Sequence, residues 1–286
     1  MRSVARRLPV LAAGLAVALG TAVVTAAPAE ARPKQQAQPG TTAAAWAPAD
    51  SAQVHPGVMT YTEGAQCTAN FVFNDPSGTY IGQAAHCAGT GGSTETDGCD
   101  SGSLPLGTRV EVAGFTGTLA YSSWLAMQQA GERDENACAY NDFALIKLPP
   151  EAVATTNPSV PFFGGPVGLG AGTTAGESVY SYGNSSLRLG LEPLSPKEGV
   201  SLGDAGDGWT TDVYTVTPGI PGDSGSGFLD SEGLAFGTLS TVQIAPLAGS
   251  NGVSNLAKEI AYAQAHGFPG LTLVNGTEPF SGGLVR

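Results

Sequence analysis

Hydrophobic residues along this chain fall in short runs separated by turn residues, which is the pattern of β-strands rather than of helices. Strand-like runs lie at 69–73, 80–84, 108–113, 142–148, 178–182, 212–216, 225–229 and 234–241. The segments 74–78 and 230–233 are rich in Asp, Ser and Gly and are predicted to be turns. Segment 254–266 has the apolar spacing of a helix, with Ser254 as its N-cap. Residues 122–129 are expected to form one or two helical turns.

Two strand-rich halves are separated by residues 149–172, which are rich in Pro and Gly. We therefore expect a mainly β protein with two small β-domains, at 55–160 and 161–270, and a C-terminal tail at 271–286. The whole chain holds 41 Gly and 20 Pro. This composition favours short strands joined by many turns over long helices.

The N-terminus has the features of a secretion signal. A basic start precedes an apolar run at 8–24, and the motif A-E-A at 29–31 fits the small-x-small rule for cleavage. An uncleaved membrane anchor is the alternative, but the apolar run is short for a bilayer span. We expect a cleaved signal peptide at 1–31, a disordered linker or short pro-segment at 32–54, and a secreted, extracellular protein.

The charge of the chain excludes some partners. It carries 12 basic and 24 acidic residues, a net charge of −12. Loss of residues 1–31 leaves 9 basic and 23 acidic residues and a net charge of −14. Such a surface repels nucleic acids and anionic lipids, so we expect no nucleic acid and, after signal cleavage, no membrane as a partner.

The chain contains four cysteines, at Cys67, Cys87, Cys99 and Cys138. An even number in an exported protein predicts two disulfides, and four cysteines allow three pairings. Because there is no C-x-x-C motif and there are only three histidines, a zinc site is poorly supported. We expect no metal and no cofactor.

Three short segments carry side chains suited to nucleophilic catalysis. They read A-A-H-C at 84–87, N-D-F-A-L-I at 141–146 and G-D-S-G-S-G at 222–227. A serine hydroxyl is a weak nucleophile unless a base lies within hydrogen-bond reach and an acid orients that base. His86 can take the proton from Ser224 and return it to the leaving group, and Asp142 can hold the imidazole in the required tautomer.

Glycines on both sides of Ser224 permit backbone angles that larger residues avoid. Such a turn can point the amides of Gly222 and Ser224 at one place, forming an oxyanion hole. A rival order, Ser224, Asp230 and His266, would match α/β-hydrolases. Ser226 breaks the G-x-S-x-G elbow of that class and alternating βα units are missing, which argues against this order. We expect His55 and His266 to be bystanders.

The three segments, in this order, resemble the trypsin/chymotrypsin-like serine proteases, in particular secreted bacterial members. The likeness is one of local motifs and their order over about 58–241. It implies two antiparallel β-barrels with a C-terminal helix, a catalytic triad of His86, Asp142 and Ser224, and a protein or peptide substrate. The expected protein is a monomeric serine endopeptidase that works through an acyl-enzyme.

The resemblance also assigns roles to further residues. In the family the cysteine after the catalytic histidine bridges to one upstream, so Cys67–Cys87 is the favoured pair and leaves Cys99 with Cys138. Ser240 would support the catalytic acid. Two departures are present: Ser226 stands where a glycine is usual, and the activation sequence I-V-G-G is absent. In animal members a freed N-terminus pairs with the acid before the nucleophile, here Asp223, so its partner in this chain is open.

Alignment to the family places the primary specificity pocket at about 214–221, with an opposite wall at 240–243. Pro218 stands where cleavage after Arg or Lys requires an acid, and no Lys, Arg or His lies between Lys197 and Lys258. The sequence therefore predicts a neutral pocket for apolar or small side chains. Two other functions stay open: a catalytically silent binding protein on the same fold, and an esterase.

Overall fold

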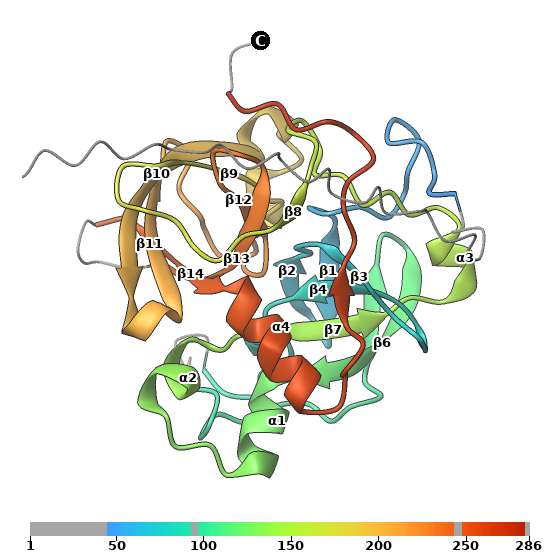
Figure 1. Cartoon of the computed structure of the whole chain (residues 1–286). Coiled ribbons are helices and arrows are strands. Elements are labelled where there is room, and N and C mark those ends of the chain that lie inside the picture. Colours follow the sequence, from blue (N-terminus) through green and yellow to red (C-terminus); the bar gives the residue numbers. More distant parts are fainter. Residues whose placement is uncertain (1–44, 93–96, 243–247, 284–286) are drawn as a thin grey trace, which may run out of the picture. The chain divides into compact units, whose positions relative to one another are not determined.

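The computed structural model describes residues 45–92, 97–242 and 248–283. The expected signal peptide lies outside them. Within the described residues, no helix is both long and apolar enough to cross a membrane. The strands of this part of the chain form two β-sheets (Figure 1).

The first sheet has eight strands in the order β15-β3-β4-β7-β6-β5-β1-β2. Its strands are β1 (Met59–Thr62), β2 (Ala65–Thr68), β3 (Val72–Asp75), β4 (Gly78–Gln83), β5 (Arg109–Val112), β6 (Phe115–Ser122), β7 (Ala144–Lys147) and β15 (Thr272–Leu273). All pairs in it are antiparallel. The extended chain from β2 to β3 pairs with β1 at one end and with β4 at the other, so the sheet closes on itself.

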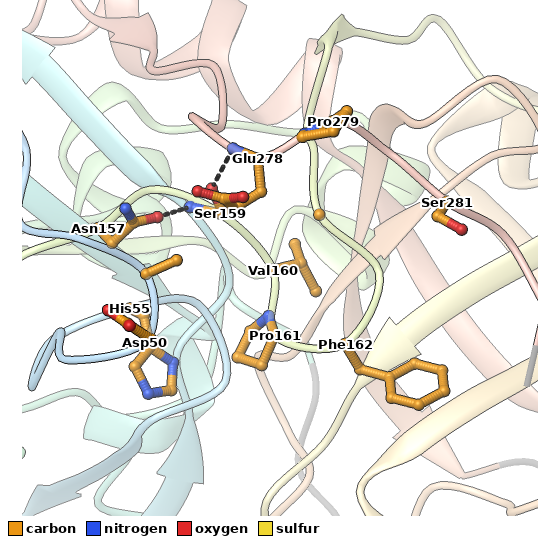
Figure 2. Close-up of a pocket in the computed structure, with 12 residues that line it drawn as sticks. Asp50, His55, Asn157, Ser159, Val160, Pro161, Phe162, Glu278, Pro279 and Ser281 are labelled. Carbon is orange, nitrogen blue, oxygen red and sulfur yellow. Dashed lines mark hydrogen bonds between the residues drawn. The ribbon is translucent and has the colours of Figure 1, made fainter. Parts of the chain in front are cut away.

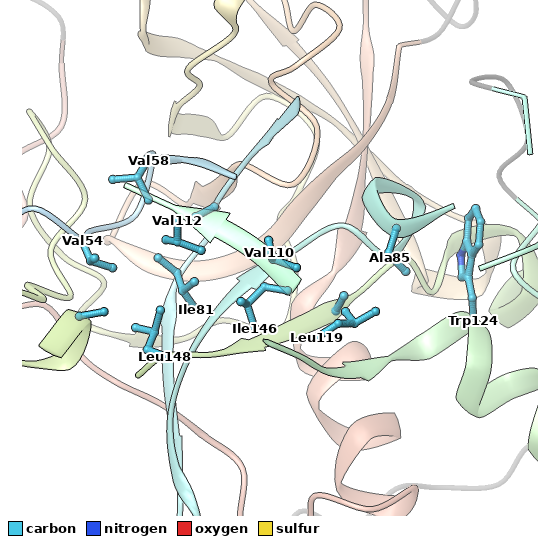
Figure 3. Close-up of a cluster of buried hydrophobic side chains, with 14 of the residues drawn as sticks. Val54, Val58, Ile81, Ala85, Val110, Val112, Leu119, Trp124, Ile146 and Leu148 are labelled. Carbon is cyan, nitrogen blue, oxygen red and sulfur yellow. The ribbon is translucent and has the colours of Figure 1, made fainter. Parts of the chain in front are cut away.

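Apolar side chains fill the interior of this first barrel (Figure 3). They alternate with polar residues along β5, where Val110 and Val112 are buried and Arg109 and Glu111 are exposed. Ile81, Leu119 and Ile146 meet them from three other strands, as expected when inward residues recur with period two.

The second sheet has seven strands in the order β12-β9-β10-β11-β14-β13-β8. They are β8 (Gly168–Leu169), β9 (Ser178–Tyr182), β10 (Pro196–Ala205), β11 (Thr210–Thr215), β12 (Gly227–Leu229), β13 (Leu234–Val242) and β14 (Asn251–Asn255). An additional pairing of β12 with β13 closes six of these strands into a barrel. The expected fold of two antiparallel β-barrels is thus confirmed, with the short β8 added in parallel.

Four α-helices lie in the described residues: α1 (Ser123–Ala130), α2 (Glu135–Tyr140), α3 (Pro150–Val153) and α4 (Leu256–Ala265). The C-terminal helix α4 is the one that the sequence predicted most clearly, but its cap differs. Asn255 accepts a hydrogen bond from the Lys258 amide at 3.1 Å and is the N-cap. Ser254 is instead paired with Thr238 in the strand before the helix, so the Ser254 prediction was wrong.

Part of the expected linker belongs to the fold. Residues 45–54 were included in the expected linker, yet the Ala47 amide donates to Thr156 at 2.9 Å and Val54 is fully buried. The C-terminal tail also joins the fold, because β15 pairs with β3 of the first barrel. Both ends of the described chain therefore contact residues of the N-terminal half: residues 45–54 bond to Thr155 and Thr156, and β15 pairs with β3.

Candidate active site

His86 and Asp142 are brought together by the pairing of two neighbouring strands. Gln83 at the end of β4 pairs with Ala144 at the start of β7. His86 follows β4 on a short 3-10 helix, Ala85–Ala88, and Asp142 precedes β7. The His86 Nδ1 lies 2.6 Å from Asp142 Oδ2, and the His86 backbone amide donates to Asp142 Oδ1 at 2.8 Å.

Asp142 is held from the second barrel as well. The Ser240 hydroxyl on β13 donates to Asp142 Oδ2 at 2.6 Å, and only 2% of the Asp142 side chain is exposed. Burial alone would raise the pKa of Asp142, but the charge of His86 and the hydrogen bonds from His86 and Ser240 outweigh it and lower that pKa. The carboxylate therefore stays ionised.

The same pair fixes the state of the imidazole. Burial tends to lower the pKa of His86, whereas the charge of Asp142 and its hydrogen bond raise it, and the net direction is upward from 6.5. With an ionised carboxylate at Nδ1, the neutral ring carries its proton on that nitrogen. Nε2 then carries the free lone pair that a general base requires.

Ser224 lies on a turn that packs closely against Thr68 at the end of β2 and against Ala84, two residues before His86. Its carbonyl oxygen accepts a hydrogen bond from the Thr68 amide at 2.8 Å. A Cβ added to Gly225 would come within 2.6 Å of the Thr68 carbonyl and 2.8 Å of the Ala84 amide nitrogen, so only glycine fits at Gly225. Among the hydrogen bonds of the described residues, none joins the Ser224 hydroxyl to the His86 ring.

The turn before Ser224 leaves two amides unused. Gly222 has φ +95°, and its carbonyl oxygen accepts from Gln66 Nε2 at 3.0 Å and from Thr68 Oγ1 at 2.8 Å. Within the described part of the chain, neither the Gly222 amide nor the Ser224 amide donates to a protein acceptor. Two free amides beside a serine hydroxyl can donate hydrogen bonds to a developing oxyanion.

Asp223, whose partner the sequence left open, is paired from inside the chain. Its Oδ2 lies 2.5 Å from Arg188 Nη2 and 3.0 Å from Lys197 Nζ, and all three side chains are buried. It also accepts from the amides of Ser185 and Ile220. Since these contacts hold the turn, no freed N-terminus is needed to order it. Sequence reasoning missed Arg188 and Lys197, because nothing local marks a cation as the partner of a distant acid.

We expect Asp223→Asn to lower the free energy of unfolding by about 3–5 kcal/mol, because two buried cations then lack their counter-charge. Urea unfolding measures the loss, with Glu63→Gln as the matched change at an exposed carboxylate. Adding Lys197→Met recovers part of the loss, since one unpaired cation is removed. A loss below about 1 kcal/mol would show that the cluster behaves like an exposed ion pair.

Both disulfides have the favoured pairing. Cys67 and Cys87 are joined at 2.02 Å, and Cys99 and Cys138 at 1.95 Å, so the prediction of two disulfides is confirmed. Two groups of metal-ligand side chains come together in the described residues, and each contains both cysteines of one disulfide. Oxidised sulfurs are not available as thiolate ligands.

The other two histidines lie elsewhere. His55 borders a cavity of about 490 Å³ with Asp50, Val160, Pro161 and Glu278 (Figure 2), and its Nδ1 lies 2.7 Å from the Pro56 carbonyl oxygen. No residue of the proposed triad lines this cavity.

The rival catalytic order finds no support in the geometry. His266 Nδ1 lies 2.8 Å from the Tyr262 carbonyl oxygen. Asp230 accepts hydrogen bonds from the amides of Glu232 and Leu234 within its hairpin. Each of these side chains therefore has a local structural role.

Comparison with solved structures identifies the fold of this chain, whereas comparison of its sequence finds no relative. No protein-family model matches the sequence and no curated protein matches it. Thermobifida fusca protease A is similar in structure, with a TM-score of 0.51 and 17% identity over 78% of this chain and 99% of that chain.

Two further solved structures are more distant. A Nocardiopsis protease has a TM-score of 0.48 and 16% identity over 77% of this chain and 98% of its own. A Cellulomonas bogoriensis chymotrypsin has a TM-score of 0.47 and 18% identity over 77% and 98%. At 17% identity, the likeness to protease A shows that this chain has the fold of bacterial chymotrypsin-like serine proteases.

Proposed function

We propose that this protein is a secreted serine endopeptidase in which Ser224 is the nucleophile, His86 the general base and acid, and Asp142 the residue that orients His86. The observation that carries this proposal is the contact of His86 with the buried, ionised Asp142. A buried carboxylate at Nδ1 leaves Nε2 as a base directed at substrate. Catalytic hydrogen bonds are often long in unliganded enzymes and tighten when substrate binds. This accounts for the lack of a hydrogen bond between the Ser224 hydroxyl and the His86 ring in the described residues.

The reaction would proceed in two halves. His86 removes the proton from the Ser224 hydroxyl as its oxygen attacks the peptide carbonyl, and the amides of Gly222 and Ser224 bind the oxyanion. His86 then gives the proton to the leaving amine, and an acyl-enzyme remains. Water attacks this ester by the same steps, which returns the hydroxyl to Ser224.

A neutral primary pocket remains part of the proposal. Arg188 and Lys197 both reach the carbonyl oxygen of Pro218, at 3.2 and 3.3 Å, so cations do approach the predicted base of the pocket. Both are bonded to Asp223 as well, and their charged ends are therefore occupied. The end of the opposite wall, Gln243, lies outside the described residues.

A panel of peptides that differ only at the cleaved position, with Phe, Leu, Ala, Arg or Glu, tests this function. We expect hydrolysis, with the Phe, Leu or Ala peptide fastest. Fastest turnover of the Arg or Glu peptide contradicts the neutral pocket. Hydrolysis of esters without any peptide cleavage supports the esterase alternative, and no hydrolysis of either supports a silent binding protein.

Secretion, the signal peptide and the monomeric state belong to the same proposal. Two disulfides are typical of proteins that fold outside the reducing cytosol. The acidic chain, with a net charge of −12, fits a soluble extracellular protein whose partner is its protein or peptide substrate.

A further inference from the structure

Glu259, an acid that the proposed mechanism does not use, is completely buried in the C-terminal helix α4. Its exposed fraction is 0%. It shares the buried face of the helix with three apolar residues, Leu256, Ile260 and Ala263. Glutamate is almost never fully buried unless a partner compensates it, so a carboxyl group on this apolar face calls for a physical reason.

Strand β13 brings the Glu259 carboxyl close to that of Asp142. The Thr238 hydroxyl donates to Glu259 Oε2 at 3.0 Å. Two residues further along the same strand, the Ser240 hydroxyl donates to Asp142 Oδ2 at 2.6 Å. Because a strand advances about 3.3 Å per residue, one short stretch of β13 holds both acids.

The contact reaches the main chain of the catalytic acid. The Asp142 amide hydrogen-bonds to the Glu259 carboxyl, and within the described residues this amide has no backbone acceptor. The backbone on either side is held by Ser123, whose hydroxyl donates to the Asn141 carbonyl oxygen at 2.7 Å and accepts from the Phe143 amide at 3.0 Å. A buried amide needs an acceptor, and Glu259 supplies the one for Asp142.

Glu259 is a neutral carboxylic acid in this setting. None of the ion pairs among the described residues includes it, and an ionised carboxylate without a cation is costly to bury. Burial first, and then the charge of Asp142, raise the pKa of Glu259 well above 4.5. The hydrogen bonds from the Thr238 hydroxyl and the Asp142 amide oppose this rise without cancelling it.

Two phenols near this position are neutral as well. Burial is the main cause that raises the pKa of Tyr121 on β6, and the charges of Tyr262 and Glu259 add to it. Burial, followed by the charge of Glu132, raises the pKa of Tyr262 to about 12. Neither phenol therefore ionises in the pH range in which His86 titrates.

We propose that Glu259 is a positioning residue that, as a neutral carboxylic acid, holds the Asp142 backbone and keeps the Asp142 carboxylate aligned with His86. An ionised glutamate would add a second negative charge next to Asp142. That charge would favour protonated His86, which cannot act as a base. The inference rests on the proposed protease function and adds a residue to its active site.

Two replacements of Glu259 test this role. Glu259→Gln keeps a neutral acceptor oxygen, so kcat and KM for a peptide substrate should stay close to the parental values. Glu259→Met has a similar size but no acceptor oxygen, and the Asp142 amide loses its partner. We expect kcat to fall roughly tenfold or more at unchanged KM, because a displacement of about 1 Å can cost up to about a hundredfold in rate.

The Met variant should also shift the pH profile. The charge of Asp142 and its hydrogen bond raise the pKa of His86, so a loosened contact lowers that pKa. Activity requires neutral His86, and the acid limb of kcat/KM should therefore move to lower pH. In Glu259→Gln the acid limb should stay in place.

Ile260→Ala is the matched control on the same helix. Ile260 is also on the buried face of α4, with 4% of its surface exposed. Its truncation leaves a cavity and lowers the melting temperature, but it removes no acceptor from Asp142. We expect unchanged kcat and an unchanged acid limb.

Infrared difference spectra of the parent protein and Glu259→Gln at neutral pH test the protonation state without relying on activity. The parent should show the carbonyl stretching band of a protonated carboxylic acid, and the Gln variant should lack it. Loss of a carboxylate band instead would overturn the neutral state of Glu259. This measurement keeps the inference testable if Glu259→Met does not fold.

The outcomes separate the inference from the proposed function. A parent protein that hydrolyses no peptide overturns both. Parent activity that depends on Ser224, together with a parental kcat and acid limb in Glu259→Met, overturns the inference alone. An equal loss of kcat in Glu259→Gln also overturns it, because a neutral acceptor would then not suffice. The same loss and pH shift in Ile260→Ala would assign the effect to packing of α4.

Discussion

Replacing Ser224 by alanine should lower kcat for peptide hydrolysis by roughly a factor of 10⁶, the loss seen when a serine hydrolase loses its nucleophile. The expected loss is this large because base, acid and oxyanion donors have nothing to act on without the hydroxyl. The same variant should lose labelling by a serine-directed fluorophosphonate. Mass spectrometry of the labelled parent protein should place the modification on Ser224.

Ser231→Ala is the matched control for this experiment. Ser231 is an exposed serine on the hairpin after β12, where its hydroxyl bonds to Glu177. It should keep both labelling and hydrolysis. Undiminished hydrolysis by Ser224→Ala, or a label on another serine, would rule out Ser224 as the nucleophile.

Replacing Asp142 by asparagine should lower kcat by roughly 10⁴-fold, because the amide favours the wrong imidazole tautomer. A second effect is expected on the pH profile. Burial lowers the pKa of His86 and the Asp142 charge raises it, so loss of that charge lowers the pKa. Activity requires neutral His86, and the acid limb of kcat/KM should therefore move to lower pH.

Asp230→Asn provides the control, because Asp230 is the acid of the rival catalytic order. Its amide oxygen can still accept from the Glu232 and Leu234 amides, so the hairpin is preserved. We expect near-parental kcat and an unchanged acid limb. A loss on Asp230→Asn comparable to that on Asp142→Asn would favour the rival order.

The strands that the sequence predicted are those with apolar, β-branched or aromatic runs. The segments 178–182 and 234–241 correspond closely to β9 and β13. Seven strands were not predicted: β1, β2, β6, β8, β10, β14 and β15. Of these, β10 and β14 read P-K-E-G-V-S-L-G-D-A and N-G-V-S-N. In β10 and β14, polar and glycine residues carry little strand preference, and backbone pairing with β9, β11 and β13 holds these two strands in the sheet.

The components of the proposed active site were visible in the sequence, because each is a short segment whose residues act together. A-A-H-C, the acid that opens a strand and the glycine-rich serine turn are local patterns with a chemical reason. The pairing of the cysteines came instead from the family resemblance. The sequence also placed Ser240 beside the acid through the family resemblance, and the 2.6 Å hydrogen bond between Ser240 and Asp142 agrees with it.

Tertiary structure alone decided which distant charges support the nucleophile turn. Arg188 and Lys197 reach Asp223 only because β9, β10 and the nucleophile turn belong to one closed barrel, and an ion pair of this kind leaves no periodic or local mark on a chain. Local sequence fixes what a residue can do chemically, whereas its neighbours depend on contacts between segments far apart in the chain.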